Sequence, residues 1–115
     1  MSSLSRPNRR GYQTGMNNVS DAESGKGLVR LRIRVHGKVQ GVFFRARAQD
    51  EARSLGVTGF ARNEPDGTVT VECEGPPDAI ERMRAWSETG PPQARVQRIE
   101  TAPLEPSGDT GFRTQ

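Results

Sequence analysis

Apolar and charged side chains alternate along residues 28–36, the first regular pattern in the chain. The apolar set is Val29, Leu31, Ile33 and Val35, and the polar set is Arg30, Arg32, Arg34 and His36. Successive side chains of a strand point to opposite faces of its sheet, so a period of two predicts a strand that is buried on one face. A loop with glycines at positions 37 and 41 follows this strand.

Beyond the loop, apolar residues recur every three or four positions, which is the period of a helix. The buried stripe is expected to consist of Phe44, Ala48, Ala52 and Leu55. Gly56 follows the last of them, and glycine commonly ends a helix because it adopts the left-handed conformation without strain. The spacing therefore predicts a helix over residues 45–55.

The next segment has the pattern of a hairpin. Residues 57–63 and 68–74 are strand-like, and the four residues between them, Glu64-Pro65-Asp66-Gly67, have the composition of a tight turn. If strand 68–74 pairs antiparallel with strand 28–36, Glu72 and Glu74 face the three arginines of that strand. The arginines would then neutralise the sheet's own carboxylates. On the other face, Cys73 is expected to be a small core residue.

A second helix is predicted after Pro76-Pro77, ending at Gly90. Its inward stripe is expected to consist of Ile80, Met83 and Trp86. Asp78 and Glu81 have the spacing of a capping box at its start. Residues 94–101 then predict a fourth strand, residues 103–110 a loop, and residues 111–114 a short closing strand.

The predicted order of elements is βαββαβ, which indicates an α+β fold. Two helices can cover only one face of such a sheet, so we expect a two-layer α/β sandwich of the ferredoxin-like type, with a four- to five-stranded antiparallel sheet. The domain spans residues 28–115. Residues 1–27 are rich in Ser, Asn, Gly and Arg without periodicity, and are expected to form a disordered N-terminal tail.

Charge argues against nucleic acid as a partner. The net charge is +3, but residues 1–27 hold four basic and two acidic side chains, so +1 remains for the domain. An RNA-binding sheet of the same topology would place stacking aromatics on the open face of its first and third strands, where this chain has Arg, Thr and Glu. Residues 1–27 also lack the continuous apolar stretch of a signal peptide and are too polar to span a membrane, so no membrane partner is expected.

Cysteine and histidine usage limits the chemistry further. One Cys and one His exclude an internal disulfide and a Cys/His metal cluster. No cofactor or metal is therefore expected, and a cytoplasmic monomer is the default expectation. His36 ends the first strand on its polar face, where a surface position is expected.

The glycine loop is the first candidate site. A strand-to-helix loop with small residues can turn consecutive N–H groups into one concavity, and the positive end of the following helix adds to its attraction for an anion. Arg45 at the helix start could close such a cradle around a phosphate. The pattern alone is weak, because many such loops bind nothing. Asn63 at the end of strand 57–63 is a second candidate, although Asn before a turn also has a purely structural explanation.

Two longer motifs resemble signatures of the acylphosphatase family. The first is Gly-Lys-Val-Gln-Gly-Val-Phe-Phe-Arg at residues 37–45, and the second is Gly-Phe-Ala-Arg-Asn-Glu-Pro-Asp-Gly-Thr-Val at residues 59–69. The resemblance implies a metal-independent hydrolysis of acyl phosphates to a carboxylate and inorganic phosphate, on the same two-layer fold. It assigns catalysis to Arg45 and Asn63. The residues implied to bind the phosphate, mainly through backbone N–H groups, are Gln40, Gly41, Val42, Phe43 and Phe44.

Two side chains and a set of backbone amides are sufficient for this reaction. The conjugate acid of the leaving carboxylate has a pKa of roughly 4, so the carboxylate departs without a general acid. Phosphoryl transfer mainly requires positioning and stabilisation of charge, which a guanidinium, backbone amides and a neutral amide can provide. The alternative is a phosphate-binding module of the same fold without catalysis.

Overall fold

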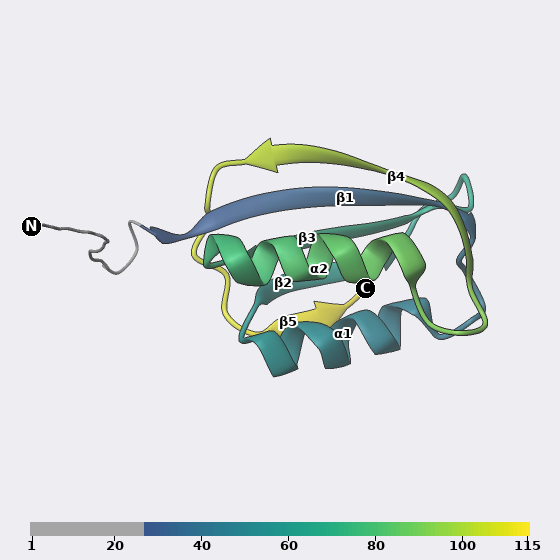
Figure 1. Ribbon diagram of the computed structural model, residues 1–115, viewed down its shortest axis with the longest axis horizontal. Helices are drawn as coiled ribbons and strands as arrows, with labels where there is room; N and C mark the ends of the chain where they lie inside the picture. The colour runs from purple at the N-terminus through teal and green to yellow at the C-terminus, as the bar shows by residue number, and fades with distance from the viewer. Residues whose placement is uncertain (1–26) are drawn as a thin grey trace, which may run out of the picture.

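The structure is a computed structural model that describes residues 27–115. The expectation of a disordered tail over residues 1–27 therefore lies outside the described residues, apart from Gly27. The elements, in chain order, are β1 (Val29–Lys38), α1 (Phe44–Leu55), β2 (Thr58–Asn63), β3 (Val69–Gly75), α2 (Pro77–Thr89), β4 (Arg95–Leu104) and β5 (Phe112–Thr114). Both helices lie over the same face of one sheet, which confirms the predicted two-layer sandwich (Figure 1).

The strands lie in the order β4-β1-β3-β2-β5. β1 pairs antiparallel with β3, and this register places Arg30 opposite Glu74 and Arg32 opposite Glu72, as the charge pattern predicted. β4 pairs antiparallel with the other edge of β1.

The fifth strand departs from the expected antiparallel sheet, because β5 runs parallel to β2. The reason lies in the path of the chain. β4 ends beside Arg30 at the start of β1, and β2 begins at that same end of the sheet, with Thr58 opposite Glu74. A segment that crosses from the end of β4 and is added beside β2 must therefore run in the same direction as β2.

The end of α1 agrees with its prediction, whereas the start of α2 does not. Gly56 ends α1 in the left-handed conformation with φ of 71°, as expected. At the start of α2, however, no side chain caps the helix, so the capping-box prediction was wrong. Pro77 is the first residue of α2, and Glu81 instead pairs with Arg84 on the next turn.

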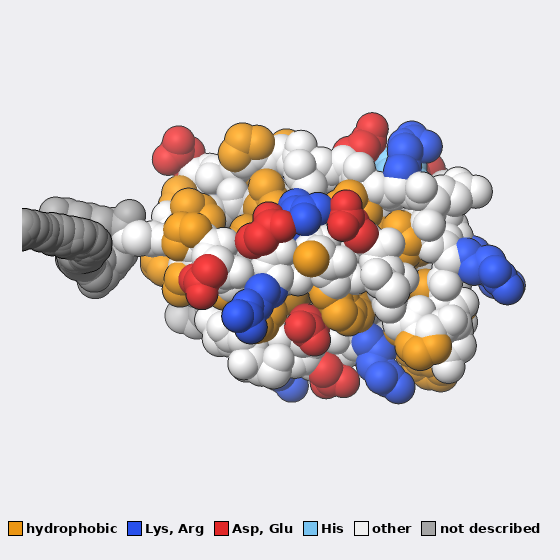
Figure 2. Space-filling view, viewed as in Figure 1, with side chains coloured by type: hydrophobic (Ala, Val, Ile, Leu, Met, Phe, Trp, Pro, Cys, Tyr) orange, Lys and Arg blue, Asp and Glu red, His pale blue; other side chains and the backbone are white. Residues whose placement is uncertain are grey.

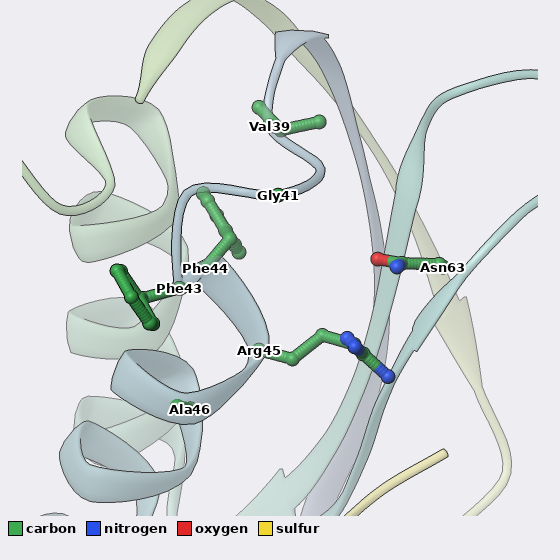
Figure 3. A pocket seen from close by; sticks show the side chains of 7 residues that line it. All are labelled: Val39, Gly41, Phe43, Phe44, Arg45, Ala46 and Asn63. Carbon is green, nitrogen blue, oxygen red and sulfur yellow. The ribbon is translucent and has the colours of Figure 1, made fainter. Parts of the chain in front are cut away.

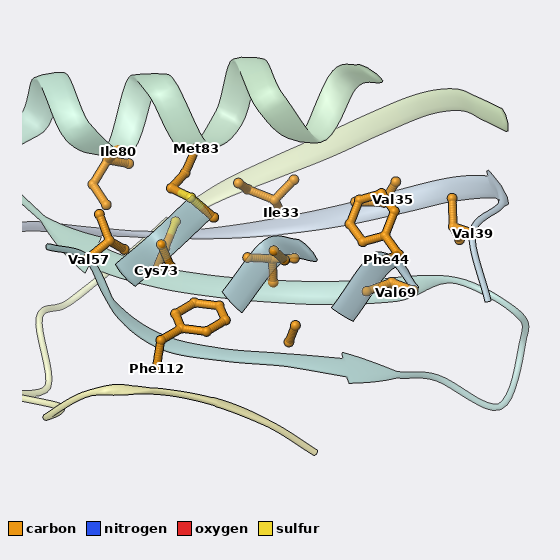
Figure 4. Packing of buried hydrophobic residues seen from close by; sticks show 14 of the residues in the cluster. Ile33, Val35, Val39, Phe44, Val57, Val69, Cys73, Ile80, Met83 and Phe112 are labelled. Carbon is orange, nitrogen blue, oxygen red and sulfur yellow. The ribbon is translucent and has the colours of Figure 1, made fainter. Parts of the chain in front are cut away.

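The hydrophobic core fills the space between the sheet and the two helices (Figure 4). Phe44 of α1 and Met83 of α2 are almost completely buried in it, and Trp86 packs edge-on against the Phe44 ring at 5.1 Å between centroids. Cys73 is buried as predicted, and burial raises the pKa of its thiol to about 12. This cysteine is therefore a core residue.

The start of β1 reverses the burial expected from the sequence, since Val29 is 39% exposed and Arg30 only 6%. On the open face of the sheet, Arg30 donates to Glu72 at 3.0 Å and to Glu74 at 3.0 Å, and it lies 2.9 Å from the carboxylate of Asp109. Glu74 also accepts the two backbone N–H groups of residues 107–108, at 2.7 and 3.0 Å. These contacts hold the segment after β4 across the sheet and cover Arg30.

Charges of both signs are interspersed on the helical face of the molecule (Figure 2). Among the described residues, neither helix is long and apolar enough to cross a membrane.

Candidate active site

A pocket of about 290 Å³ lies where the loop after β1, the start of α1 and the end of β2 meet. Its lining consists of Val39, Gly41, Phe43, Phe44, Arg45, Ala46 and Asn63 (Figure 3). The two residues predicted to be catalytic, Arg45 and Asn63, therefore line the same pocket. Three of the five predicted loop residues line it with them, whereas Gln40 and Val42 do not.

The loop is bent by two residues in the left-handed conformation, Gly41 with φ of 73° and Phe43 with φ of 65°. Phe43 is also the residue that precedes the first turn of α1. The first N–H groups of a helix have no acceptor inside the helix. Outside the helices and strands, no backbone hydrogen bond of residues 27–115 uses an N–H of residues 41–46. This stretch can therefore offer several free donors and the positive end of a helix to one anion.

Arg45 lies in the first turn of α1, and its side chain extends toward β2 (Figure 3). Its Nη1 donates to the backbone oxygen of Gln115, just beyond β5, at 2.7 Å. This bond orients the guanidinium before any ligand binds. A planar guanidinium suits phosphate oxygens because its donors form a rigid fork.

Asn63 is the last residue of β2, and its side chain points across the pocket toward the loop and Arg45 (Figure 3). The next carboxylate along the chain, Glu64, does not line the pocket. It accepts a hydrogen bond from Thr70 at 2.6 Å and pairs with Arg62 at 3.1 Å. The Thr70 bond is the main cause that lowers the pKa of Glu64, and Arg62 adds to the effect against the opposing contribution of burial. This carboxylate therefore stays ionised and is held outside the pocket by Thr70 and Arg62. Inside the pocket, its charge would repel a phosphate.

Gln40 has a structural role that the sequence did not reveal. Its side-chain Nε2 donates to the backbone oxygens of Glu64 at 2.8 Å and Thr68 at 2.9 Å. Both amide hydrogens are thus used to tie the loop to the connection between β2 and β3. Since Asn63 directly precedes Glu64, this tie holds the two sides of the pocket at a fixed separation.

Sequence reasoning assigned no role in the site to Gln115. The pattern predicted a short strand at residues 111–114, but the expected antiparallel sheet gave that strand the wrong direction. The parallel pairing of β5 with β2 carries the chain toward the pocket, and a backbone bond from Gln115 N to Ala61 O at 2.9 Å holds it there. The contact with Arg45 is made by a backbone oxygen, which no residue type signals.

Comparison with known proteins places the chain in a family. The model of the family described as Acylphosphatase matches residues 31–114. A protein of Thermococcus kodakarensis named Acylphosphatase is 49% identical over 85 residues, which cover 74% of this chain and 93% of that protein. One of Anaeromyxobacter dehalogenans with the same name is 51% identical over 83 residues, covering 72% of this chain and 89% of that one.

A solved structure supports the fold as well. The structure of an acylphosphatase from Coxiella burnetii has a TM-score of 0.76 and 33% identity, and the match covers 78% of this chain and 95% of that one. The resemblance to the acylphosphatase family is thus confirmed over residues 31–114. On the family match, the relatives and the fold together, this chain belongs to the acylphosphatase family.

Proposed function

We propose that the chain hydrolyses acyl phosphates in the pocket between residues 40–44, Arg45 and Asn63. The observation that carries the proposal is that a guanidinium and a neutral amide line one pocket beside a loop whose N–H groups, at a helix start, have no backbone acceptor within residues 27–115. The names of the relatives support this reaction, because acylphosphatases act on mixed carboxylic–phosphoric anhydrides.

The phosphoryl group would bind to the loop and to Arg45. Backbone N–H groups of residues 41–46 and the remaining donors of Arg45 would bind the three non-bridging oxygens of the phosphoryl group. In a loose transition state the charge is spread over these oxygens, so donors fixed in advance stabilise it without reorganisation. The tie made by Gln40 and the bond from Arg45 to Gln115 provide this fixed arrangement.

Asn63 would place the attacking water. Its amide has both a donor and an acceptor but no charge, so it can orient a water molecule without repelling the phosphate. The water oxygen forms a bond to phosphorus while the bond from phosphorus to the acyl oxygen breaks. The leaving carboxylate takes that electron pair, and the proton lost by the water ends on the phosphate product. Holding the water in line with the leaving oxygen lowers the barrier chiefly through entropy.

The test is an assay of the purified chain with acetyl phosphate in the presence of a chelator, following the loss of the anhydride. We expect hydrolysis at a rate that the chelator does not change. Binding of inorganic phosphate without any hydrolysis would instead identify a phosphate-binding module, and it would contradict the proposal.

We also propose that the protein acts as a cytoplasmic monomer without a nucleic-acid or membrane partner. The buried single cysteine, the near-neutral charge of the domain and the pairing of Arg30 within the chain support this view. Light scattering after size-exclusion chromatography tests the monomer, since a dimer would double the measured mass.

A further inference from the structure

Two cations face each other where β1 ends and β4 begins. The register places Lys38, the last residue of β1, directly opposite Arg95, the first residue of β4. Like charges directly opposite each other on antiparallel strands destabilise the pairing. The three arginines of β1, in contrast, lie opposite glutamates of the neighbouring strands, namely Glu74, Glu72 and Glu100. The pair of Lys38 and Arg95, which we call the basic pair, therefore has a cost that the fold does not explain.

The charges of the basic pair are not compensated within the described part of the chain. Both side chains are exposed, and no carboxylate of residues 27–115 forms an ion pair with either of them. Glu100, the carboxylate of β4, already bonds to His36 at 2.8 Å. Asp66, in the turn after β2, lies 3.6 Å from Arg34. A local positive charge thus remains, although the domain as a whole carries only +1.

The backbone holds the basic pair in a fixed place. The register of β1 and β4 shifts between His36 and Gly37, and this bulge brings Arg95, rather than Val96, opposite Lys38. The two strands approach so closely here that a Cβ atom on Gly37 would lie 2.1 Å from the backbone oxygen of Arg95. Bulges often redirect a side chain beside an active site. In this sheet, the bulge sets the two cations against each other at the end next to the glycine loop.

The basic pair lies beside the pocket without forming part of its lining. Lys38 directly precedes Val39, which is buried and lines the pocket with Arg45 and Asn63 (Figure 3). Neither Lys38 nor Arg95 lines it, so the pair can act on a ligand there through its electric field. A phosphoryl group carries about two negative charges at neutral pH. Charges are screened over about 10 Å at 0.1 M salt and over about 30 Å at 0.01 M, so this attraction is long-ranged at low salt.

We propose that the basic pair steers phosphoryl anions into the candidate site. Lys38 and Arg95 then raise the capture of the substrate without touching it. The inference rests on the proposed function, since it concerns the same pocket and the same substrate. A local potential of opposite sign raises both the encounter rate and the occupancy of a charged ligand, and the gain falls steeply as ionic strength rises. This dependence on salt distinguishes steering from a structural role.

The experiment compares the wild type with a variant that carries both Lys38→Gln and Arg95→Gln. We measure kcat and kcat/KM for acetyl phosphate at ionic strengths of about 10 mM and about 500 mM. At the lower value, kcat/KM should fall about three- to tenfold while kcat stays within about twofold. At the higher value, the difference in kcat/KM should be less than about twofold. Urea unfolding should show no loss of stability, because the substitutions remove a repulsion.

The matched control carries Arg53→Gln and Arg82→Gln. It loses the same amount of charge from two exposed arginines that form no ion pair within residues 27–115 and do not line the pocket. Its kcat/KM should stay within about twofold of the wild type at both ionic strengths. Equal losses in the two variants at low salt would overturn the inference, because net charge alone would then explain them. A loss in the basic-pair variant that does not depend on salt would also overturn it.

Binding of inorganic phosphate separates this inference from the proposed function. Titrations followed by phosphorus NMR measure this binding without any turnover. In the basic-pair variant, the dissociation constant should rise about three- to tenfold at low ionic strength and less than about twofold at high ionic strength. This result in a protein that does not hydrolyse acetyl phosphate would contradict the proposed function alone. Equal dissociation constants in the wild type and the variant at low ionic strength would overturn the role of the basic pair.

Discussion

Arg45 and Asn63 line one pocket but differ in charge, and this difference divides the proposed work between them. A guanidinium stabilises an anion in both the ground state and the transition state. A neutral amide that orients water acts on the reaction without holding the phosphate. Substitutions at the two positions should therefore affect different kinetic constants.

Replacing Asn63 with alanine should lower kcat for acetyl phosphate by about a hundredfold, because the water would lose its orientation. Inhibition by inorganic phosphate should stay within about twofold of the wild type. Initial-rate kinetics with phosphate as a competitive inhibitor measure both quantities. Near-normal turnover in this variant would remove Asn63 from the mechanism.

Replacing Arg45 with alanine should weaken phosphate inhibition by roughly ten- to a hundredfold, the effect expected for charge-assisted hydrogen bonds. Arg45→Lys keeps the charge but loses the planar fork, and it should recover only part of the binding. Phosphate inhibition constants for the two variants provide the comparison. Circular dichroism is needed as a control, since the bond to Gln115 is lost in both. Full binding in Arg45→Ala would show that the loop alone holds the anion.

Among the individual residues of the candidate site, the sequence predicted those whose side chains are chemically distinctive. Arg45 and Asn63 stand in motifs, and the structure places both in one pocket. The contacts of Gln40 and Gln115 could not be predicted, since they join backbone oxygens to side chains 24 to 70 positions away. Any residue can supply a backbone oxygen, so the sequence contains no signal for such a contact.

Among the elements, the loop between β1 and α1 depends on its tie to the connection between β2 and β3. Both hydrogen bonds of this tie come from one side chain, that of Gln40. The loop would otherwise be free to move away from Asn63. The geometry of the pocket is therefore set by a residue that does not line it.

Gln40→Leu should lower the free energy of unfolding by about 1–3 kcal/mol, because two carbonyl groups lose their partner. We also expect kcat to fall about tenfold or more, since displacements of about 1 Å are costly in a positioned reaction. Urea unfolding and initial rates measure the two effects.

Gln49→Leu is the matched control for this variant. Gln49 donates from α1 to the backbone oxygen of Phe112 at 2.9 Å, and neither residue lines the pocket. It should lose stability with a smaller loss of kcat than Gln40→Leu. Equal losses of kcat in the two variants would argue against a specific positioning role for Gln40.

The strands and helices themselves were largely predictable. Alternation along residues 28–36 and the helical spacing from Phe44 to Ala52 reflect burial on one face, which is a property of the sequence. The prediction of a capping box at Asp78 was wrong, because Pro77 is already a good first helical residue and α2 begins there. The predicted antiparallel direction of β5 was wrong, because the direction depends on which edge of the sheet the preceding segment reaches.

For the molecule as a whole, the network around Arg30 joins three parts of the chain on the open face of the sheet. Glu72 and Glu74 belong to β3, whereas Asp109 belongs to the segment that leads from β4 to β5. That segment must cross the sheet to deliver β5 beside β2. The network therefore supports the edge of the molecule from which Gln115 reaches Arg45.

The stabilisation from Glu74 should depend on pH. Burial raises the pKa of this carboxyl, but the Ser107 N–H, Arg30 and the Gly108 N–H together outweigh burial, so the pKa lies below its ordinary value of 4.5. The unfolded chain then binds the proton more tightly than the folded one. The stabilisation is complete above the ordinary value and is lost as the pH falls through the lower pKa of the folded state.

Glu74→Gln removes this charge while keeping the shape of the side chain. It should lower the free energy of unfolding by about 1–3 kcal/mol at neutral pH. The difference from the wild type should shrink as the pH falls below 4.5, the ordinary pKa of the group. Urea unfolding at neutral pH and at a series of lower pH values provides the test, and a difference independent of pH would show that the ionised form of Glu74 contributes nothing.

The strand order β4-β1-β3-β2-β5 also bears on when the pocket can form. Neither neighbour of β1 follows it directly in the chain, and Arg45 finds its partner 70 residues later. Such distant pairings are slow to close, since much chain must be ordered before they are made. A chain still emerging from the ribosome, with its signature loop synthesised but β3 not yet made, would offer phosphate no finished cradle. The enzyme is thus expected to become active late, after translation has passed its last strand.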